Sequence, residues 1–350
     1  MTPFISSYAL STNLMQSILT AQNNLAQAEQ EVSTGTYADV GLTLGAQTSQ
    51  DISLRSEQSL LETLNTTNNL VSTNLSTAQN ALQTLQTTAQ NLLKSLVGTS
   101  GDNGASDGAA SVQQDAQSAL QSLISELNTN VNGSYIFAGI NTSVAPITDY
   151  YGAGAPNQSA VNTAFSSTFG FSQSSSNVST ITSSQMQSFL TNQFAPLFQG
   201  SNWTSDWSSA SNTATTAEIS PSQTVTTSVS ANQPAFQELA QAYTMVAELG
   251  TQNLSSSAYQ TLSSNAQSLI NSALTGLTDL QSQLGTVQSA ITAANSQMSV
   301  QMNVLSTQIG NLENVNTYQA STQVTDLQTQ IETAYTLTSQ LSQLSLVKYL

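Results

Sequence analysis

The sequence has no histidine and no cysteine, and only three of its 350 residues carry a positive side-chain charge: Arg55, Lys94 and Lys348. Without histidine and cysteine, the chain lacks the commonest general base, all thiol chemistry and the usual zinc ligands. The sequence also has 19 acidic residues, so its net charge is −16. This balance argues against binding to nucleic-acid phosphates or to anionic membranes, so we expect neither a nucleic-acid nor a membrane partner.

Groupings of residues that support catalysis are also missing. The acids are scattered singly, and Glu29 and Glu31, only two positions apart, point to different sides of a helix. The acidic segment Gly101–Gly108 (GDNGASDG) lacks the ligand spacing and the final glutamate of a calcium loop. No phosphate-binding loop of the Walker or dinucleotide type occurs. We therefore predict that the protein is not an enzyme, with no catalytic, cofactor or metal site.

Long hydrophobic runs are absent as well. No apolar stretch approaches the roughly 18 residues that span a bilayer. The first 22 residues have neither the basic segment nor the continuous apolar segment of a general secretory signal. An extracellular location would therefore require another export route.

What the chain does have is apolar residues spaced alternately by three and four, the pattern of amphipathic helices. The first run comprises Leu14, Ile18, Ala21, Leu25, Ala28 and Val32. A second helical run follows from Leu54 to Leu96, with Glu57 and Asn68 as the polar positions on its apolar seam. A third run covers Val112 to Leu127.

The C-terminal part repeats this organisation. Pro234 is placed to begin a helix and Gly250 to end it. A long helix is expected from about Leu262 to Leu312. A final apolar stripe comprises Val324, Leu327, Ile331, Ala334, Leu337, Leu341 and Leu344.

The middle of the chain, residues 140–233, has a different character. It contains both tryptophans, Trp203 and Trp207, the β-leaning stretch Thr224–Val229 and the low-complexity stretch Ser172–Ser184. These features predict a small inserted domain that contains β-structure. The two tryptophans suit core packing better than a ligand-stacking pair.

Together the patterns predict a mainly α fold, an elongated antiparallel helical bundle or coiled coil of the N- and C-terminal segments with the small β-containing insertion. We expect a terminal coiled-coil domain (1–40 with 320–350), a long helical rod (41–139 with 234–319) and an inserted outer domain (140–233). The candidate assembly interface consists of Leu14, Ile18, Leu25, Val32, Leu327, Ile331, Leu341, Leu344, Leu346 and Tyr349.

Four short motifs, in the right order, resemble those of flagellar hook–filament junction proteins. The strongest is NGSYIFAG, with Asn132, Gly133, Tyr135, Phe137 and Gly139 at its defining positions. The others are Ser33–Leu42, Gln283–Gln288 and the terminal Leu344–Leu350 (LSLVKYL). Helices of this family normally carry more lysine and arginine, so subunit contacts here would depend on apolar packing and amide hydrogen bonds.

The resemblance implies a structural subunit between the hook and the filament of the bacterial flagellum. It also implies export through the flagellar type III channel without a cleaved signal peptide. Expected partners are further copies in a ring or helical layer, another hook-associated protein on the hook side, flagellin on the filament side and an export chaperone. A flagellin filament subunit is the nearest alternative; a coiled-coil adhesin, a phage fibre protein and a cytosolic helical bundle are the others.

Overall fold

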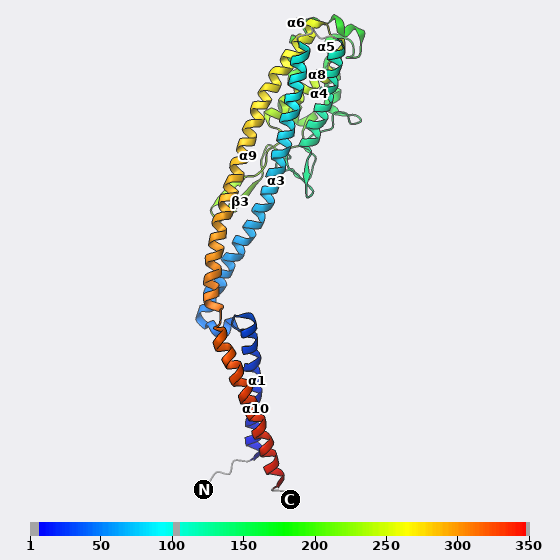
Figure 1. Cartoon of the computed structure of the whole chain (residues 1–350). Coiled ribbons are helices and arrows are strands. Elements are labelled where there is room, and N and C mark those ends of the chain that lie inside the picture. Colours follow the sequence, from blue (N-terminus) through cyan, green and yellow to red (C-terminus); the bar gives the residue numbers. More distant parts are fainter. Residues whose placement is uncertain (1–6, 101–105, 348–350) are drawn as a thin grey trace. The chain divides into compact units, whose positions relative to one another are not determined.

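The computed structural model describes residues 7–100 and 106–347, which form two units. Unit 1 takes in the described residues up to Thr63 and from Met298 onward, and unit 2 comprises Leu64–Gln297. The boundary between the units falls within two long helices, α3 (Thr48–Ser100) and α9 (Ser256–Glu313) (Figure 1).

Unit 1 is built around two antiparallel helices, α1 (Ser7–Thr34) and α10 (Thr317–Val347), which lie side by side (Figure 1). Gly35 adopts φ +75° and ends α1, a conformation that glycine reaches without a steric penalty. The Asp39 carboxylate then caps α2 (Val40–Leu44) by accepting a hydrogen bond from the Leu42 amide at 2.8 Å. A 3₁₀ turn, η1 (Gly45–Gln47), leads into α3.

Unit 2 contains the antiparallel remainders of α3 and α9, joined by amide and hydroxyl contacts. Gln79 Nε2 donates to the Gln281 carbonyl at 2.8 Å, and the hydroxyls of Thr99 and Tyr259 lie 2.6 Å apart. A second helix pair, α4 (Ser106–Leu127) and α8 (Pro234–Glu248), packs together within the same unit. As predicted, Pro234 is the first residue of α8, and Gly250 adopts a left-handed conformation (φ +72°) just beyond its end.

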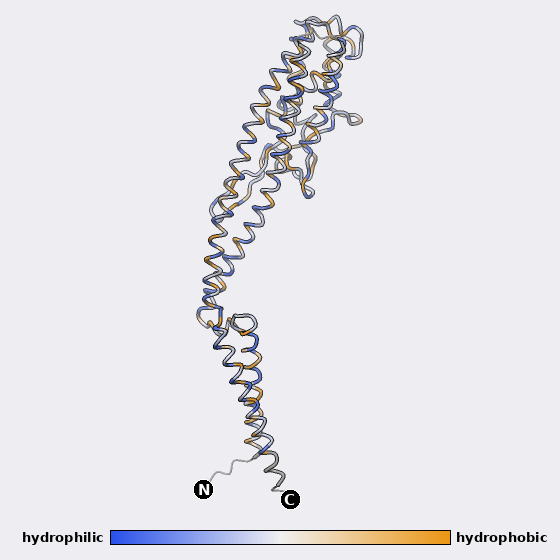
Figure 2. The backbone as a smooth tube through the Cα atoms, in the orientation of Figure 1, coloured by the Kyte–Doolittle hydropathy of each residue, from blue (hydrophilic) through white to orange (hydrophobic). Residues whose placement is uncertain are grey.

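The helices are rich in serine and threonine, which favour helices only weakly because their hydroxyls compete for backbone groups. Here many of these hydroxyls donate to the carbonyl four residues earlier in the same helix; examples are Thr63 to Ser59, Thr73 to Asn69 and Thr87 to Gln83. These hydroxyls therefore bond to carbonyls of their own helix, and the helix continues without interruption. Figure 2 shows the hydrophobic residues recurring along each helix, without long continuous runs.

The segment from 140 to 233 consists mostly of short helical turns and belongs to unit 2. Its helices are α5 (Pro156–Phe169), η2 (Ser176–Thr180), α6 (Ser183–Phe189), η3 (Leu190–Phe194), η4 (Ala195–Phe198), α7 (Gly200–Asn202) and η5 (Trp203–Trp207). It holds one antiparallel hairpin, β3 (Thr216–Ser220) with β4 (Gln223–Thr226), in which Thr216 faces Thr226. The 3₁₀ turn η6 (Thr251–Asn253) separates α8 from α9.

Two of these turns, η3 and η5, are π-helical, and they help to gather aromatic rings in the core. Phe165, Phe189, Phe194 and Phe198 form a chain of ring contacts with centroids 4.9 to 5.9 Å apart. The chain continues to Trp207 at 5.1 Å, and Trp207 stacks on Trp203 at 5.6 Å. The buried residues of these turns form one hydrophobic core with those of α4 and α8.

The structure confirms the predicted fold class: long N- and C-terminal helices that pack together, with a small β-containing region. It also confirms the core role of both tryptophans, which are buried. In α3, one position of the predicted seam is wrong. Asn68 is buried as expected, but Glu57 is exposed and Gln58 takes the half-buried position beside it.

Candidate assembly surfaces

The pairing of α1 with α10 buries few side chains. Ile18 (4% exposed) and Ala28 on α1, and Ala320 and Leu327 on α10 (8% exposed for Leu327), are buried. Gln22 Nε2 also donates to the Tyr335 hydroxyl at 2.9 Å. The rest of the seam between these helices is half-buried at best. Much of the apolar surface of the pair therefore stays open to solvent.

The predicted interface residues divide by position along this pair. Ile18 and Leu327 are buried in it, whereas Leu14, Leu25, Ile331 and Leu341 are half-buried. Val32 is 36% exposed, and Glu31 takes the half-buried position beside it. Tyr349 lies outside the described residues. Leu344 and Leu346 fall within α10, but their side chains lie outside the described part of the chain.

Large apolar side chains on the same two helices lie outside the seam. Met15 and Leu19 on α1 are 61% and 54% exposed, and Tyr335 and Leu337 on α10 are about half exposed. Thr338, not Leu337, is the half-buried seam residue there. Met15 and Leu19 are four positions apart and therefore form a stripe on one side of α1. A surface of this kind is typical of an interface with another protein.

The NGSYIFAG motif forms a tight hairpin followed by a buried crossing. Strands β1 (Asn130–Val131) and β2 (Ser134–Tyr135) pair antiparallel, and Asn132 and Gly133 turn between them with φ values of +52° and +85°. Strand β2 ends at Tyr135, before Phe137. The chain leaves the strand because the backbone beyond it pairs with two other segments.

These pairings explain why the end of the motif is Phe-Ala-Gly. The Phe137 carbonyl accepts from the Ala231 amide at 2.7 Å, and the buried ring stands edge-on to Phe236 at 5.8 Å. The Ala138 carbonyl accepts from the Ser211 amide at 2.9 Å. Gly139 has φ +61°, and a Cβ atom there would lie 2.5 Å from the Ser211 carbonyl oxygen. Only glycine permits this approach.

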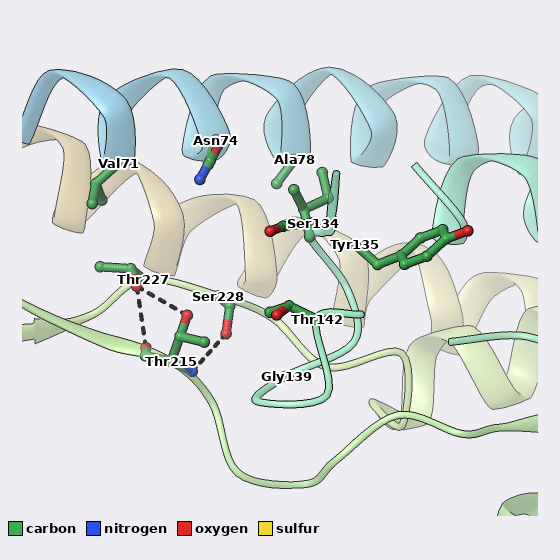
Figure 3. A pocket seen from close by; sticks show the side chains of 11 residues that line it. Val71, Asn74, Ala78, Ser134, Tyr135, Gly139, Thr142, Thr215, Thr227 and Ser228 are labelled. Atoms are coloured by element: carbon green, nitrogen blue, oxygen red, sulfur yellow. Dashed lines mark hydrogen bonds between the residues drawn. The ribbon is translucent and has the colours of Figure 1, made fainter. Parts of the chain in front are cut away.

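A cavity of about 180 Å³ lies between the motif and α3 (Figure 3). Val71, Asn74 and Ala78 of α3 face Ser134, Tyr135, Ile136, Gly139 and Thr142 of the motif region and Thr215, Thr227 and Ser228. None of these residues is charged. The Oδ1 atom of Asn74 is buried there without a hydrogen-bond partner among the described residues. The size of the cavity and the polar groups in its lining suit ordered water better than a large ligand.

In unit 1, an ion cluster joins the beginning of α3 to the end of α9. Arg55 contacts Asp51 at 3.4 Å and donates to both carboxylate oxygens of Glu313. Residue spacing did not predict this cluster. The rarity of arginine was the only feature of the sequence that marked Arg55 as a residue with a special role. Nearby, the backbone of Thr36 bridges that of Asn314, and the Tyr37 amide donates to the Glu313 carbonyl at 2.9 Å.

A half-buried acid–phenol contact occurs in unit 2. The Tyr151 hydroxyl donates to Glu248 Oε1 at 2.9 Å, and burial raises the pKa of Glu248 above the usual value for glutamate. Among residues 7–100 and 106–347, no group of three or more metal-ligating side chains gathers. Within the same ranges, no helix combines the length and apolarity needed to cross a membrane.

Two family models match the chain at its two ends. The model described as the bacterial flagellin N-terminal helical region matches residues 5–142, and the one described as the bacterial flagellin C-terminal helical region matches residues 267–350. The chain belongs to the flagellin family. It is a structural component of the bacterial flagellum, and this membership decides against the adhesin, phage-fibre and cytosolic-bundle alternatives.

The two flagellin regions coincide with the helices that carry the surfaces described above. The N-terminal match extends from α1 to the NGSYIFAG motif, and the C-terminal match covers most of α9 and all of α10. Flagellin-like proteins assemble with copies of themselves and with other flagellar proteins. The open α1–α10 surface therefore lies in a region of the chain that the family shares.

A solved structure supports the fold assignment. It comes from Vibrio parahaemolyticus and is provisionally described as a flagellar hook-associated protein. The similarity has a TM-score of 0.53 at 9% sequence identity, and it covers 76% of this chain and 97% of the other. No curated protein matches the sequence.

Proposed function

We propose that this flagellin-family chain is the subunit that joins the hook to the filament, as a hook-associated junction protein. The observation that carries the proposal is the NGSYIFAG motif, which resembles the junction-protein signature. The terminal sequence LSLVKYL resembles the end of the same proteins. The description of the Vibrio structure as hook-associated gives further support.

On this proposal the chain leaves the cell through the flagellar channel without a cleaved signal peptide, held before export by a chaperone. It then forms a ring or helical layer that contacts a second hook-associated protein on one side and flagellin on the other. Its role is structural and requires no catalysis. Because the sequence has few cations, these contacts depend on apolar packing and on amide hydrogen bonds.

The second candidate is a filament subunit. It is favoured by the two matching models, both of which are described as regions of bacterial flagellin. The two functions differ in copy number and in location: a filament subunit fills the whole filament, whereas a junction subunit occupies a short zone at its base.

Gold-labelled antibody against this protein, applied to isolated flagella, distinguishes the candidates. We expect label only where the hook meets the filament. A strain without the gene should retain its hooks, lack filaments and release flagellin into the medium. Label along the whole filament would support the second candidate and refute the first.

We further propose that the open stripe on α1, Met15 and Leu19, is buried by neighbouring copies on assembly. Replacing both with glutamine should lower the free energy gained on assembly by about 1 kcal/mol for each side chain, because each would bury less apolar surface. The concentration needed for assembly should then rise roughly thirtyfold. Asn13→Gln with Asn23→Gln, two exposed polar positions of the same helix, is the matched control and should assemble normally. Normal assembly of the Met15, Leu19 variant would contradict the assignment.

The three-part organisation predicted from the sequence is also a proposal for the assembled state. In it, residues 1–40 with 320–350 make the innermost contacts, 41–139 with 234–319 form the rod, and 140–233 face outward. Cross-linking in mixtures of single-cysteine variants, with the cysteine at Leu19, Leu70 or Ile140, exposed positions in the three parts, tests the order. Cross-links between different parts of neighbouring copies would argue against it.

A further inference from the structure

Two buried carboxylates in unit 1 face one guanidinium. Asp51 lies in the first turn of α3, Arg55 one turn later, and Glu313 is the last residue of α9. Asp51 and Glu313 are only 4% and 5% exposed, whereas about half of the Arg55 side chain reaches solvent. If both acids were ionised, the cluster would hold an uncompensated negative charge in a site that is mostly shielded from water, which is unfavourable.

The hydrogen bonds show which carboxylate lacks a partner. Arg55 Nε donates to Glu313 Oε1 at 2.7 Å, and its Nη2 donates to both oxygens of the same carboxylate. Asp51 has only the longer contact of 3.4 Å from its Oδ2 to Arg55 Nε. Its Oδ1 is buried without a donor among the described residues. A proton on Asp51 would supply what is missing, because the protonated acid can donate to the neighbouring carboxylate of Glu313.

The electrostatic surroundings agree with this geometry. Burial raises the pKa of Asp51, and the adjacent Glu313 carboxylate raises it further, while Arg55 lowers it by less. The other titratable side chains of the connectors are Glu31, Tyr37 and Asp39. Glu31 accepts from the Ala38 amide at 3.2 Å and Asp39 from the Leu42 amide at 2.8 Å. Neither supplies a cation to the cluster.

We propose that Asp51 and Glu313 share one buried proton in the folded subunit, which together with Arg55 makes a neutral joint between α3 and the end of α9. The bond that forms is a hydrogen bond from the protonated carboxyl of Asp51 to the carboxylate of Glu313, and the proton comes from solvent. The titration is observed at Asp51.

The joint lies where the two helix connectors of unit 1 meet. The Val315 amide donates to the Gly35 carbonyl, and the Tyr37 amide to the Glu313 carbonyl, both at 2.9 Å. The folded state holds the proton of Asp51 more tightly than the unfolded chain does. The stability of unit 1 falls as the pH rises from the ordinary pKa of aspartate to that of Asp51, and then levels off. A pH above the pKa of Asp51 therefore loosens the joint, and a pH below it tightens the joint.

The test is a pH titration of the full chain labelled with ¹³C at aspartate carboxyl groups and followed by NMR. One resonance should titrate above the other aspartates, and it should be absent in D51N. D39N, a capping aspartate in the same connector, is the control and should leave that resonance in place. If every aspartate titrates in the ordinary range, no shared proton exists.

A second variant separates the shared proton from burial alone. E313Q leaves Arg55 to pair with Asp51 only, so the pKa of Asp51 should fall from its raised value. If burial alone were responsible, the raised pKa would persist in E313Q, and the sharing would be refuted. Should E313Q fail to fold, D51N still decides, since asparagine imitates the protonated acid. D51N should keep its stability as the pH rises through the raised pKa of Asp51, where the parent chain loses part of its stability, and equal losses in the two proteins would overturn the proposal.

Discussion

Gly139 offers a sharp test of how the NGSYIFAG motif is held. Its φ of +61° disfavours any residue with a side chain, and a Cβ atom would lie 2.5 Å from the Ser211 carbonyl oxygen and 2.6 Å from that of Thr213. Both obstacles are backbone atoms and cannot rotate away. A methyl group therefore forces the segments apart and strains two hydrogen bonds, Ile140 amide to Thr213 at 3.0 Å and Ser211 amide to Ala138 at 2.9 Å.

The expected loss can be built from these parts. A left-handed conformation costs alanine roughly 1 to 2 kcal/mol relative to glycine. Each weakened hydrogen bond removes about 1 kcal/mol. We therefore expect Gly139→Ala to lower the free energy of unfolding of unit 2 by about 3 to 4 kcal/mol.

Urea unfolding followed by tryptophan fluorescence measures this loss, because Trp203 and Trp207 both lie in the core of unit 2. Gly133→Ala is the matched control, since Gly133 has φ +85° but no atom within 4 Å of its potential Cβ. The control should lose only the conformational part, about 1 to 2 kcal/mol. Equal losses in the two variants would refute the argument from close approach.

Three further outcomes are expected. Asn68→Ala removes the donor to the Ile219 carbonyl and to Asn295 Oδ1, so it should destabilise unit 2 by about 2 to 3 kcal/mol; Asn69→Ala, at an exposed neighbour, should cost far less in the same urea assay. Because burial raises the pKa of Glu248, its charged form opposes folding; Glu248→Gln should raise the urea midpoint at neutral pH, and this gain should vanish as the pH falls through the ordinary range of glutamate. Each subunit carries a net charge of −16, so copies repel one another, and added salt should screen this repulsion and accelerate assembly, as measured by light scattering. A slower rate of assembly in salt would mean that attractive ionic contacts dominate.

Spacing alone was sufficient to predict the long helices. Apolar residues recur at three- and four-residue steps through α1, α3, α9 and α10, and a helix is the structure that brings such positions onto one face. The two termini of α8 were also predicted, because Pro234 and Gly250 act locally through their backbone conformations. The spacing did not predict every seam residue correctly. Gln58 and Thr338 are half-buried, whereas the predicted seam residues Glu57 and Leu337 are exposed.

Two features depend on contacts that spacing does not encode. The short turns between residues 140 and 233 have no repeat to detect, and they are organised by rings such as Phe165, Phe194 and Trp207 that find each other only in the folded core. The Arg55–Glu313 contact joins residues 258 positions apart. A lone cation in sequence does not reveal its partner, and only the meeting of the two connectors brings these charges together.

The inward-bonded hydroxyls of the helices have a consequence for how subunits pack. A threonine that already donates to its own helix, as Thr292 does to Gln288 and Thr329 to Thr325, loses little when water leaves its surface. Short hydroxyl side chains also have few rotamers to freeze, unlike lysine or arginine. Two such surfaces can be dehydrated against each other without a fixed set of partners, so neighbouring helices can slide by small steps and still fit. An assembly made from them can bend while keeping every subunit bound.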